Sequence, residues 1–263
     1  MSEAAVRTKD TILVNRMHMA HRLDGGVAHR ARIGLIVLAS DHTIEHEWRR
    51  MLDVDGIAVY QSRIANSPTI TPETLKEMEA GLTRATEVIL PGVDLDVVAY
   101  GCTSGAMVIG EDTVAARIRK ARPEVAVTTP ITAALAGMKA LGVRRVALLT
   151  PYIDRINRLM RDYIEARGVA VPVMGSFNNE NDNEVARIAP ASLRDAAVEL
   201  AAEPSVDGVF VACTSLRLAE VVEEIETISG KPALSSNHAM AWHALRLARY
   251  REQVPGYGRL LRI

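Results

Sequence analysis

The segment VVAYGCTSGAM, residues 97–107, is an apolar run that stops abruptly at a small polar cluster. The segment VFVACTSLRLA, residues 209–219, repeats this pattern. A short apolar run rich in valine and bounded by Gly, Thr and Ser predicts a buried strand. The chain has two cysteines, Cys102 and Cys213, and each begins a Cys-Thr-Ser triplet at the end of such a strand. The two triplets therefore predict equivalent positions in two related halves of the fold.

Outward from these triplets, strand-like runs alternate with helical patterns along the chain. This alternation predicts an α/β fold with parallel sheets that helices cover on both faces. We expect strands at 31–40, 57–64, 95–101, 125–130, 144–150, 169–175 and 207–213, and helices at 43–53, 71–89, 111–122, 131–142, 151–168, 192–203, 216–230 and 238–250.

The pattern of strands and helices restarts near residue 130, which indicates two lobes. Cys102 lies 69 residues after Ile33, and Cys213 lies 67 residues after Val146. This near-match is what an internal duplication leaves. The predicted organisation is an N-terminal extension at 1–30, a first α/β lobe at 31–130 to which a C-terminal helix at 236–250 returns, and a second α/β lobe at 131–235.

Charge and hydropathy exclude several classes of partner. The chain of 263 residues has 31 Lys and Arg against 32 Asp and Glu, which argues against recognition of a nucleic acid or an acidic membrane by bulk charge. No apolar run reaches the roughly 18 residues of a membrane span. The first 26 residues mix charges and lack the apolar core of a secretory signal. We therefore expect a cytoplasmic protein with reduced thiols, although two cysteines would also allow one disulfide.

The position of the two cysteines favours chemistry. Ligands of parallel α/β sheets bind at the carboxyl ends of strands. Thr and Ser after each cysteine can cap a following helix, whose N-terminus favours an anion and can lower a thiol pKa from about 8.5 towards 7. Two such thiols across a cleft would place acid/base groups on opposite faces of one ligand. The alternative is that each cysteine is a small core residue, but the matched triplets favour catalysis.

A metal site is a weaker interpretation of the sequence. His42 and His46 are four residues apart on a predicted helix, a spacing that can bind a metal. No cysteine lies near them in the sequence, and such a pair more often lies on a solvated helix face. We expect neither a metal nor a cofactor.

Six segments spread over most of 31–250 form a recognisable set of motifs. They are IGLIVLASDHTIE (33–45), GCTSGAM (101–107), ALLTPY (147–152), NEVARI (183–188), ACTS (212–215) and SSNHAMAWHALR (235–246). Together, and in this order, these segments resemble the aspartate/glutamate racemase superfamily. Within it, the chain is most similar to the group of maleate cis–trans isomerases and arylmalonate decarboxylases, and to the racemase-like branch of ectoine utilisation.

The resemblance implies two pseudo-symmetric Rossmann-like lobes with a small carboxylate substrate in the cleft and no cofactor. By position, Cys102 matches the first-lobe thiol, which attacks the substrate or acts as a base. Cys213 matches the acid/base thiol of the second lobe. Dimers and tetramers are common in the group, so a homo-oligomer is expected. The residues matching those that bind the substrate are Thr103, Ser104, Tyr152, Asn183, Thr214 and Ser215.

The chain departs from the maleate isomerases in the loop after its first strand. Asp41 lies where those enzymes have an asparagine. A carboxylate there would repel a second substrate carboxylate or accept from an amine, which favours an amino-acid-like or N-acylated ligand. Alternatively, Asp41 only caps the helix that begins near Thr43.

These observations predict a cofactor-independent racemase or isomerase of a small carboxylate, in ectoine catabolism according to the branch resembled. One alternative is an arylmalonate-type decarboxylase, but the decarboxylases resembled have a glycine at the position of Cys102. The other is a two-lobed binding protein without catalysis, which would need neither thiol.

Overall fold

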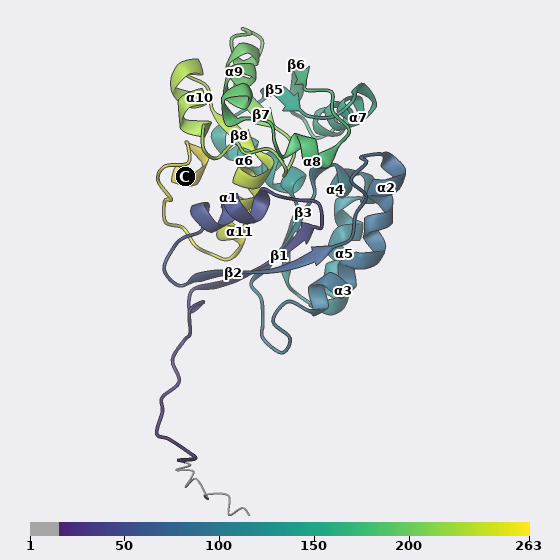
Figure 1. Cartoon of the computed structure of the whole chain (residues 1–263). Helices are drawn as coiled ribbons and strands as arrows, with labels where there is room; N and C mark the ends of the chain where they lie inside the picture. Colours follow the sequence, from purple (N-terminus) through teal and green to yellow (C-terminus); the bar gives the residue numbers. More distant parts are fainter. Residues whose placement is uncertain (1–15) are drawn as a thin grey trace, which may run out of the picture.

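The computed structural model of the protein describes residues 16–263, which form two four-stranded sheets and the helices around them (Figure 1). Half of the predicted extension, residues 1–15, lies outside the described residues. Residues 16–30 contain no helix or strand, are almost entirely exposed, and run away from the two sheets.

The two sheets have the same topology. The first has the order β2-β1-β3-β4 and the second the order β6-β5-β7-β8, and all neighbouring strands are parallel. Each strand of the second sheet therefore occupies the place of the strand four numbers earlier. This confirms the predicted α/β fold with two related lobes. The strands are β1 (Ala31–Leu38), β2 (Ile57–Ile64), β3 (Val97–Gly101), β4 (Ala126–Thr128), β5 (Arg145–Thr150), β6 (Ala170–Ser176), β7 (Gly208–Val211) and β8 (Ala233–Ser235).

Helices cover the sheets, as expected for buried parallel strands. No helix within residues 16–263 is long and apolar enough to cross a membrane. The α-helices are α1 (Ile44–Met51), α2 (Pro72–Glu77), α3 (Leu82–Glu87), α4 (Thr103–Ile109), α5 (Glu111–Ala121), α6 (Pro130–Leu141), α7 (Asp154–Glu165), α8 (Asp182–Val185), α9 (Pro190–Ala201), α10 (Val222–Ser229) and α11 (Ser236–Leu247), with short 3-10 helices η1 (Met78–Gly81) and η2 (Leu260–Arg262).

Local signals explain why α6 begins and ends where it does. The side chain of Thr129 accepts a hydrogen bond from the backbone N–H of Thr132, and Pro130 occupies the first turn. Both features favour a helix start. Gly142 ends the helix in the left-handed conformation, with φ of 73°.

Two predicted helices differ from the structure. The helix expected at 71–89 is divided into α2, η1 and α3. The helix expected at 216–230 begins only at Val222, because the backbone N–H of Ala219 donates to the buried carboxylate of Glu47 (2.7 Å) instead of to a helical carbonyl. The preceding Leu216 and Leu218 are fully buried in this irregular segment.

The helix α11 joins the two sheets. It begins directly after β8 of the second sheet and packs against α6, α1, β3 and β4. The C-terminal segment packs on this helix in turn, with Leu260 and Leu261 fully buried. The indole of Trp242 donates to the carbonyl of Ile263 (3.1 Å), so the chain end is held against its own core.

Candidate active site

The first thiol lies directly after β3. Cys102 is the N-cap of α4, and its Sγ accepts a hydrogen bond from the backbone N–H of Gly105 (3.2 Å). A Cβ at position 105 would lie 2.8 Å from Cys102 Sγ, Met78 Cε and Tyr100 Oη. Glycine is therefore required for the thiol to reach the helix N-terminus. The cap was predicted to be Thr or Ser, but the structure assigns it to the cysteine itself.

The second thiol lies two residues after β7. Sγ of Cys213 accepts from the backbone N–H of Ser215 (3.4 Å), and its own N–H donates to Ser236 Oγ (3.1 Å). No helix begins here, since α10 starts at Val222. The prediction of a helix N-terminus beside each thiol is therefore correct for Cys102 and wrong for Cys213.

One buried serine connects the two triplets. The Ser236 hydroxyl, in the first turn of α11, forms a hydrogen bond with the Thr103 hydroxyl (2.7 Å) and accepts from the N–H of Cys213. The Thr214 hydroxyl also donates to the carbonyl of Gly101 (3.3 Å). Local sequence patterns do not predict the bonds from Ser236 to Thr103 and from Thr214 to Gly101, because the partners in each are more than one hundred residues apart. The motif SSNHAMAWHALR was the signal that marked this segment.

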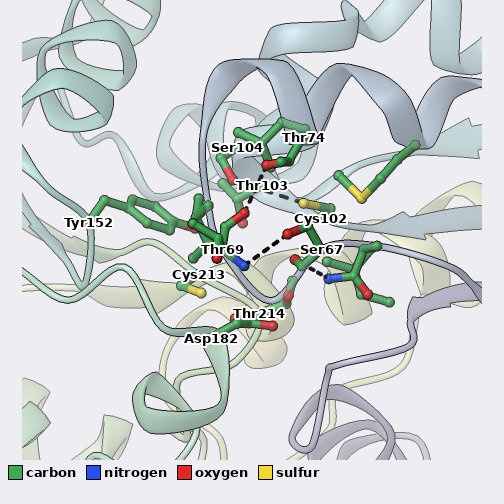
Figure 2. Close-up of a pocket in the computed structure, with 15 residues that line it drawn as sticks. Ser67, Thr69, Thr74, Cys102, Thr103, Ser104, Tyr152, Asp182, Cys213 and Thr214 are labelled. Carbon is green, nitrogen blue, oxygen red and sulfur yellow. Dashed lines mark hydrogen bonds between the residues drawn. The ribbon is translucent and has the colours of Figure 1, made fainter.

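Both thiols line one cavity between the lobes. Its enclosed volume is about 20 Å³, which is room for about one water molecule, and the empty space reaches about 400 Å³ only when the open solvent at its mouth is counted. Figure 2 shows the two sulfurs among hydroxyl-bearing side chains from both lobes. The lining residues are Leu38, Asn66, Ser67, Thr69, Ile70, Thr74, Leu75, Met78, Cys102, Thr103, Ser104, Tyr152, Asp182, Cys213 and Thr214.

Two loops meet beside this cavity. The loop after β2 and the loop before α8 form an isolated antiparallel bridge between Thr69 and Asn181. The backbone N–H of Asp182 donates to Pro68 O (3.2 Å), and that of Ile70 to Glu180 O (3.4 Å). Four residues of the loop after β2 line the cavity and were not predicted from the sequence: Asn66, Ser67, Thr69 and Ile70. A polar loop without a motif carries no local signal that it faces a ligand.

Burial determines the protonation of the thiols. It raises the pKa of Cys102 to about 12, although the N–H of Gly105 partly offsets the effect. Burial also raises the pKa of Cys213, and the charge of Asp182 adds to the rise at both sulfurs. The expected lowering by a helix N-terminus is therefore wrong for the ligand-free site, because desolvation outweighs one backbone donor. Both groups are neutral thiols, and neither forms a disulfide.

Four of the predicted binding residues meet at the cavity with the cysteines: Thr103, Ser104, Tyr152 and Thr214. Burial, followed by the nearby thiols, raises the pKa of Tyr152 well above its usual value. The phenol is therefore a neutral hydrogen-bond donor. It lies beside Cys213 and Ser104, one from each lobe.

The three other predicted binding residues do not line the cavity. Asp41 Oδ1 accepts from the N–H of Thr43 (2.7 Å) and of Ile44 (2.8 Å), so the alternative of a helix cap describes its position. Burial raises the pKa of Asp41 to about 6. The Ser215 hydroxyl points to Asp182 Oδ1 (2.8 Å).

Asn183 is the clearest correction among the predicted binding residues. It is exposed, and its Oδ1 lies 2.9 Å from Nε2 of His42, outside the cavity. The neighbouring Asp182 lines the cavity instead and is 5% exposed. The helix α8 begins at residue 182 and directs the side chain of Asp182 inward and that of Asn183 outward. The position of this helix start in the Asn-rich segment 178–183 therefore decides which of the two residues faces a ligand.

The two candidate metal-binding histidines belong to separate interactions. His42 faces Asn183, and His46 lies 3.5 Å from Glu220. Within residues 16–263, His, Cys, Asp and Glu form no cluster of three or more that would hold a metal ion.

Two parallel α/β lobes that each bring a buried thiol to one shared cavity define a class of two-thiol α/β enzymes. A family model for arylmalonate decarboxylase matches residues 95–261. The maleate isomerase of Nocardia farcinica is 30% identical over 241 residues, which cover 88% of this chain and 95% of that protein. The chain therefore belongs to the arylmalonate decarboxylase family, in the aspartate/glutamate racemase-like group that includes the maleate isomerases.

Two further relatives extend the comparison. Arylmalonate decarboxylase of Bordetella bronchiseptica is 38% identical over 135 residues, so the match spans 51% of this chain and 56% of that protein. A cysteine-to-serine mutant of the Nocardia farcinica maleate cis–trans isomerase, solved with a covalently bound succinylcysteine intermediate, has a TM-score of 0.80 and 29% identity, covering 88% of this chain and 98% of that one. The isomerase relatives support the prediction that this protein is an isomerase.

Proposed function

We propose that the protein is a cofactor-independent racemase or isomerase of a small carboxylate, with Cys102 and Cys213 as its catalytic thiols. The main support for the proposal is that two buried thiols, one from each lobe, line a single cavity. A binding protein needs neither thiol. A reaction that moves a proton between the faces of one carbon needs one acid and one base.

The neutral state of both thiols sets the order of events. A thiol with a pKa raised by burial is a competent proton donor, whereas the attacking or proton-abstracting partner must first become a thiolate. In a racemisation, one thiolate removes a proton from the substrate carbon and the opposite thiol returns one. In a cis–trans isomerisation, the Cys102 thiolate adds to a double bond while Cys213 protonates the neighbouring carbon. After rotation about the resulting single bond, Cys213 removes a proton from that carbon and Cys102 leaves as a thiolate.

The hydroxyl groups around the thiols suit a carboxylate and its enolate. Thr103, Ser104 and the neutral phenol of Tyr152 are donors at the cavity surface. Donors fixed in a buried site stabilise negative charge that develops in the transition state. The covalent succinylcysteine in the Nocardia farcinica enzyme supports the covalent version of this scheme.

The likeness to the ectoine-utilisation branch extends the proposal to ectoine catabolism. An N-acetyl-diaminobutyrate would then be a substrate or product. We also propose a cytoplasmic location, where both thiols stay reduced, and a homo-oligomer, which light scattering of the purified protein tests directly.

Decarboxylation of an arylmalonate is the second candidate function. The match of residues 95–261 to the decarboxylase family favours it. Cys102 argues against it, because the decarboxylases resembled have glycine there and work with the second-lobe cysteine alone. The two candidates therefore predict different effects of removing Cys102.

The test is incubation with maleate, D- and L-aspartate, N-acetyl-diaminobutyrate and phenylmalonate in deuterated water. We expect deuterium incorporation or a change of stereochemistry, and a fall of roughly 10²–10⁴-fold in Cys102→Ala and in Cys213→Ala. Circular dichroism and the thermal midpoint control for folding. Release of carbon dioxide that survives Cys102→Ala would assign the decarboxylase instead, and full exchange in both variants would refute the two-thiol mechanism.

A further inference from the structure

The charge of the cavity is unusual for a site that binds an anion. Asp182 lines it and is 5% exposed, yet among residues 16–263 no Lys, Arg or His belongs to the lining. Within the described part of the chain, Asp182 also forms no ion pair. A buried carboxylate without a cation is costly unless its oxygens are otherwise satisfied.

The hydrogen bonds of Asp182 satisfy it only in part. Oδ1 accepts from the Ser215 hydroxyl (2.8 Å), and Oδ2 accepts from the Ser40 hydroxyl. A carboxylate offers about four lone-pair sites. Asp182 therefore retains acceptor capacity on the side that faces the cavity, and its two protein partners are neutral.

Two cationic groups from segments beside the cavity have partners other than Asp182. The guanidinium of Arg63 donates to three backbone carbonyls and to Glu45 (2.7 Å). Nε2 of His42 lies against Asn183 Oδ1, outside the cavity. Asp41, which is also buried, lies near Asp182 but does not line the cavity. Within the described residues, no cationic side chain of the lining compensates the charge of Asp182.

Neutral hydroxyl groups line the same cavity as this carboxylate. In the view of Figure 2, Ser104 lies above the two sulfurs and Asp182 lies below them. The cavity therefore offers a ligand both neutral hydroxyl donors, which suit an anion, and a carboxylate, which suits a cation.

We propose that Asp182 binds a cationic amino group of the substrate, so that the substrate class is a small carboxylate that also carries an ammonium group. This inference deepens the proposed function and rests on the cavity being the substrate site. A second carboxylate at this position would be repelled. Asp182 thereby becomes a specificity-determining residue that favours amino acids over dicarboxylates.

Charge neutralisation would also help the thiols to react. The charge of Asp182 raises the pKa of both Cys102 and Cys213, which opposes thiolate formation. An ammonium group bound to Asp182 cancels this field at close range. Only a substrate that carries an ammonium group would then lower the pKa of the thiol that attacks it.

Isothermal titration calorimetry of the full chain tests the inference with two pairs of probes that differ by one amino group. The pairs are aspartate with succinate and 2-aminobutyrate with butyrate. We expect the wild type to bind the aminated member of each pair at least 10-fold more tightly. The change Asp182→Asn keeps the shape and should reduce that preference by roughly 10- to 100-fold, as expected for a hydrogen bond to a charged group. Asn183→Ala, next to it but outside the cavity, is the matched control and should keep the preference.

The outcomes separate this inference from the proposed function. Tighter binding of succinate by the wild type, no binding of either aminated probe, or an unchanged preference in a folded Asp182→Asn variant would each overturn the role of Asp182. Cysteine-dependent turnover of a dicarboxylate without an amino group, such as maleate, and not of the aminated acids would uphold the isomerase and overturn this inference. Ammonium-selective binding without proton exchange would uphold the inference and refute the isomerase. If Asp182→Asn does not fold, the preference of the wild type for the aminated probes still tests the inference.

Discussion

A buried glutamate makes the stability of this protein depend on pH. Glu47 on α1 is 1% exposed, and its two oxygens accept from the N–H of Ala219 (2.7 Å) and from Nδ2 of Asn237 (2.8 Å). It therefore connects the first lobe to the segment after the second triplet and to α11. Burial raises the pKa of Glu47 from 4.5 to about 7, and the two hydrogen bonds offset only part of the rise.

The size of the effect follows from the two pKa values. The shift from 4.5 to about 7, at about 1.4 kcal/mol per unit, corresponds to about 3 kcal/mol. The folded protein binds more protons than the unfolded chain between these values, so the free energy of unfolding falls as the pH rises. The contribution of Glu47 is fully present below pH 4.5 and is lost as the pH rises through about 7.

The assay is urea unfolding between pH 4 and 8.5, followed by the fluorescence of Trp48, whose buried indole donates to Asn237 O (3.1 Å) beside Glu47. Glu47→Gln is neutral at every pH. The difference in unfolding free energy between it and the wild type should therefore change by about 3 kcal/mol across this range. Glu77→Gln, exposed on α2, is the matched control and should follow the wild type. A difference that does not vary with pH would refute the reasoning, because it would mean that Glu47 ionises without cost.

Two other substitutions test the geometry around the thiols. Ser236→Ala leaves the N–H of Cys213 without its acceptor. We expect the free energy of unfolding in urea to fall by about 2 kcal/mol and kcat to fall with little change in KM. An unchanged kcat would contradict a positioning role for Ser236. Gly105→Ala places a Cβ 2.8 Å from Cys102 Sγ, and this contact must displace the thiol. We expect turnover to fall by up to about 10²-fold in a protein that still folds. Wild-type activity would show that the position of the thiol is not critical.

The sequence predicted those features that depend on neighbouring residues. Apolar runs ended by small polar residues located every strand except β8, because a strand buried on both faces of a parallel sheet must be apolar along its length. The two Cys-Thr-Ser triplets were placed correctly at the ends of β3 and β7 for the same reason. Short elements were missed. The helix α4 begins with Thr-Ser-Gly, and no local pattern distinguishes it from a turn.

Errors arose where a distant segment competes with local preference. The helix predicted from residue 216 is replaced by an irregular segment up to Val222, because Glu47, far away in the chain, takes the N–H of Ala219. Spacing along the Asn-rich loop at 178–183 could not decide which of its side chains faces a ligand. The bridge between Thr69 and Asn181 holds this loop, and Asp182 rather than Asn183 lines the cavity.

The sequence by itself determined the two α/β lobes and the identity of the two thiols, because strand burial, turn residues and motif order are local properties. Only the tertiary structure decided which polar side chains surround those thiols and how they are charged. Burial reversed the predicted direction of the pKa shift at Cys102, since the loss of water around a thiol is a property of all the segments packed against it. The carboxylate of Asp182 lines the same cavity as both sulfurs for the same reason, because the packing of the two lobes, and not spacing along the chain, brings it there.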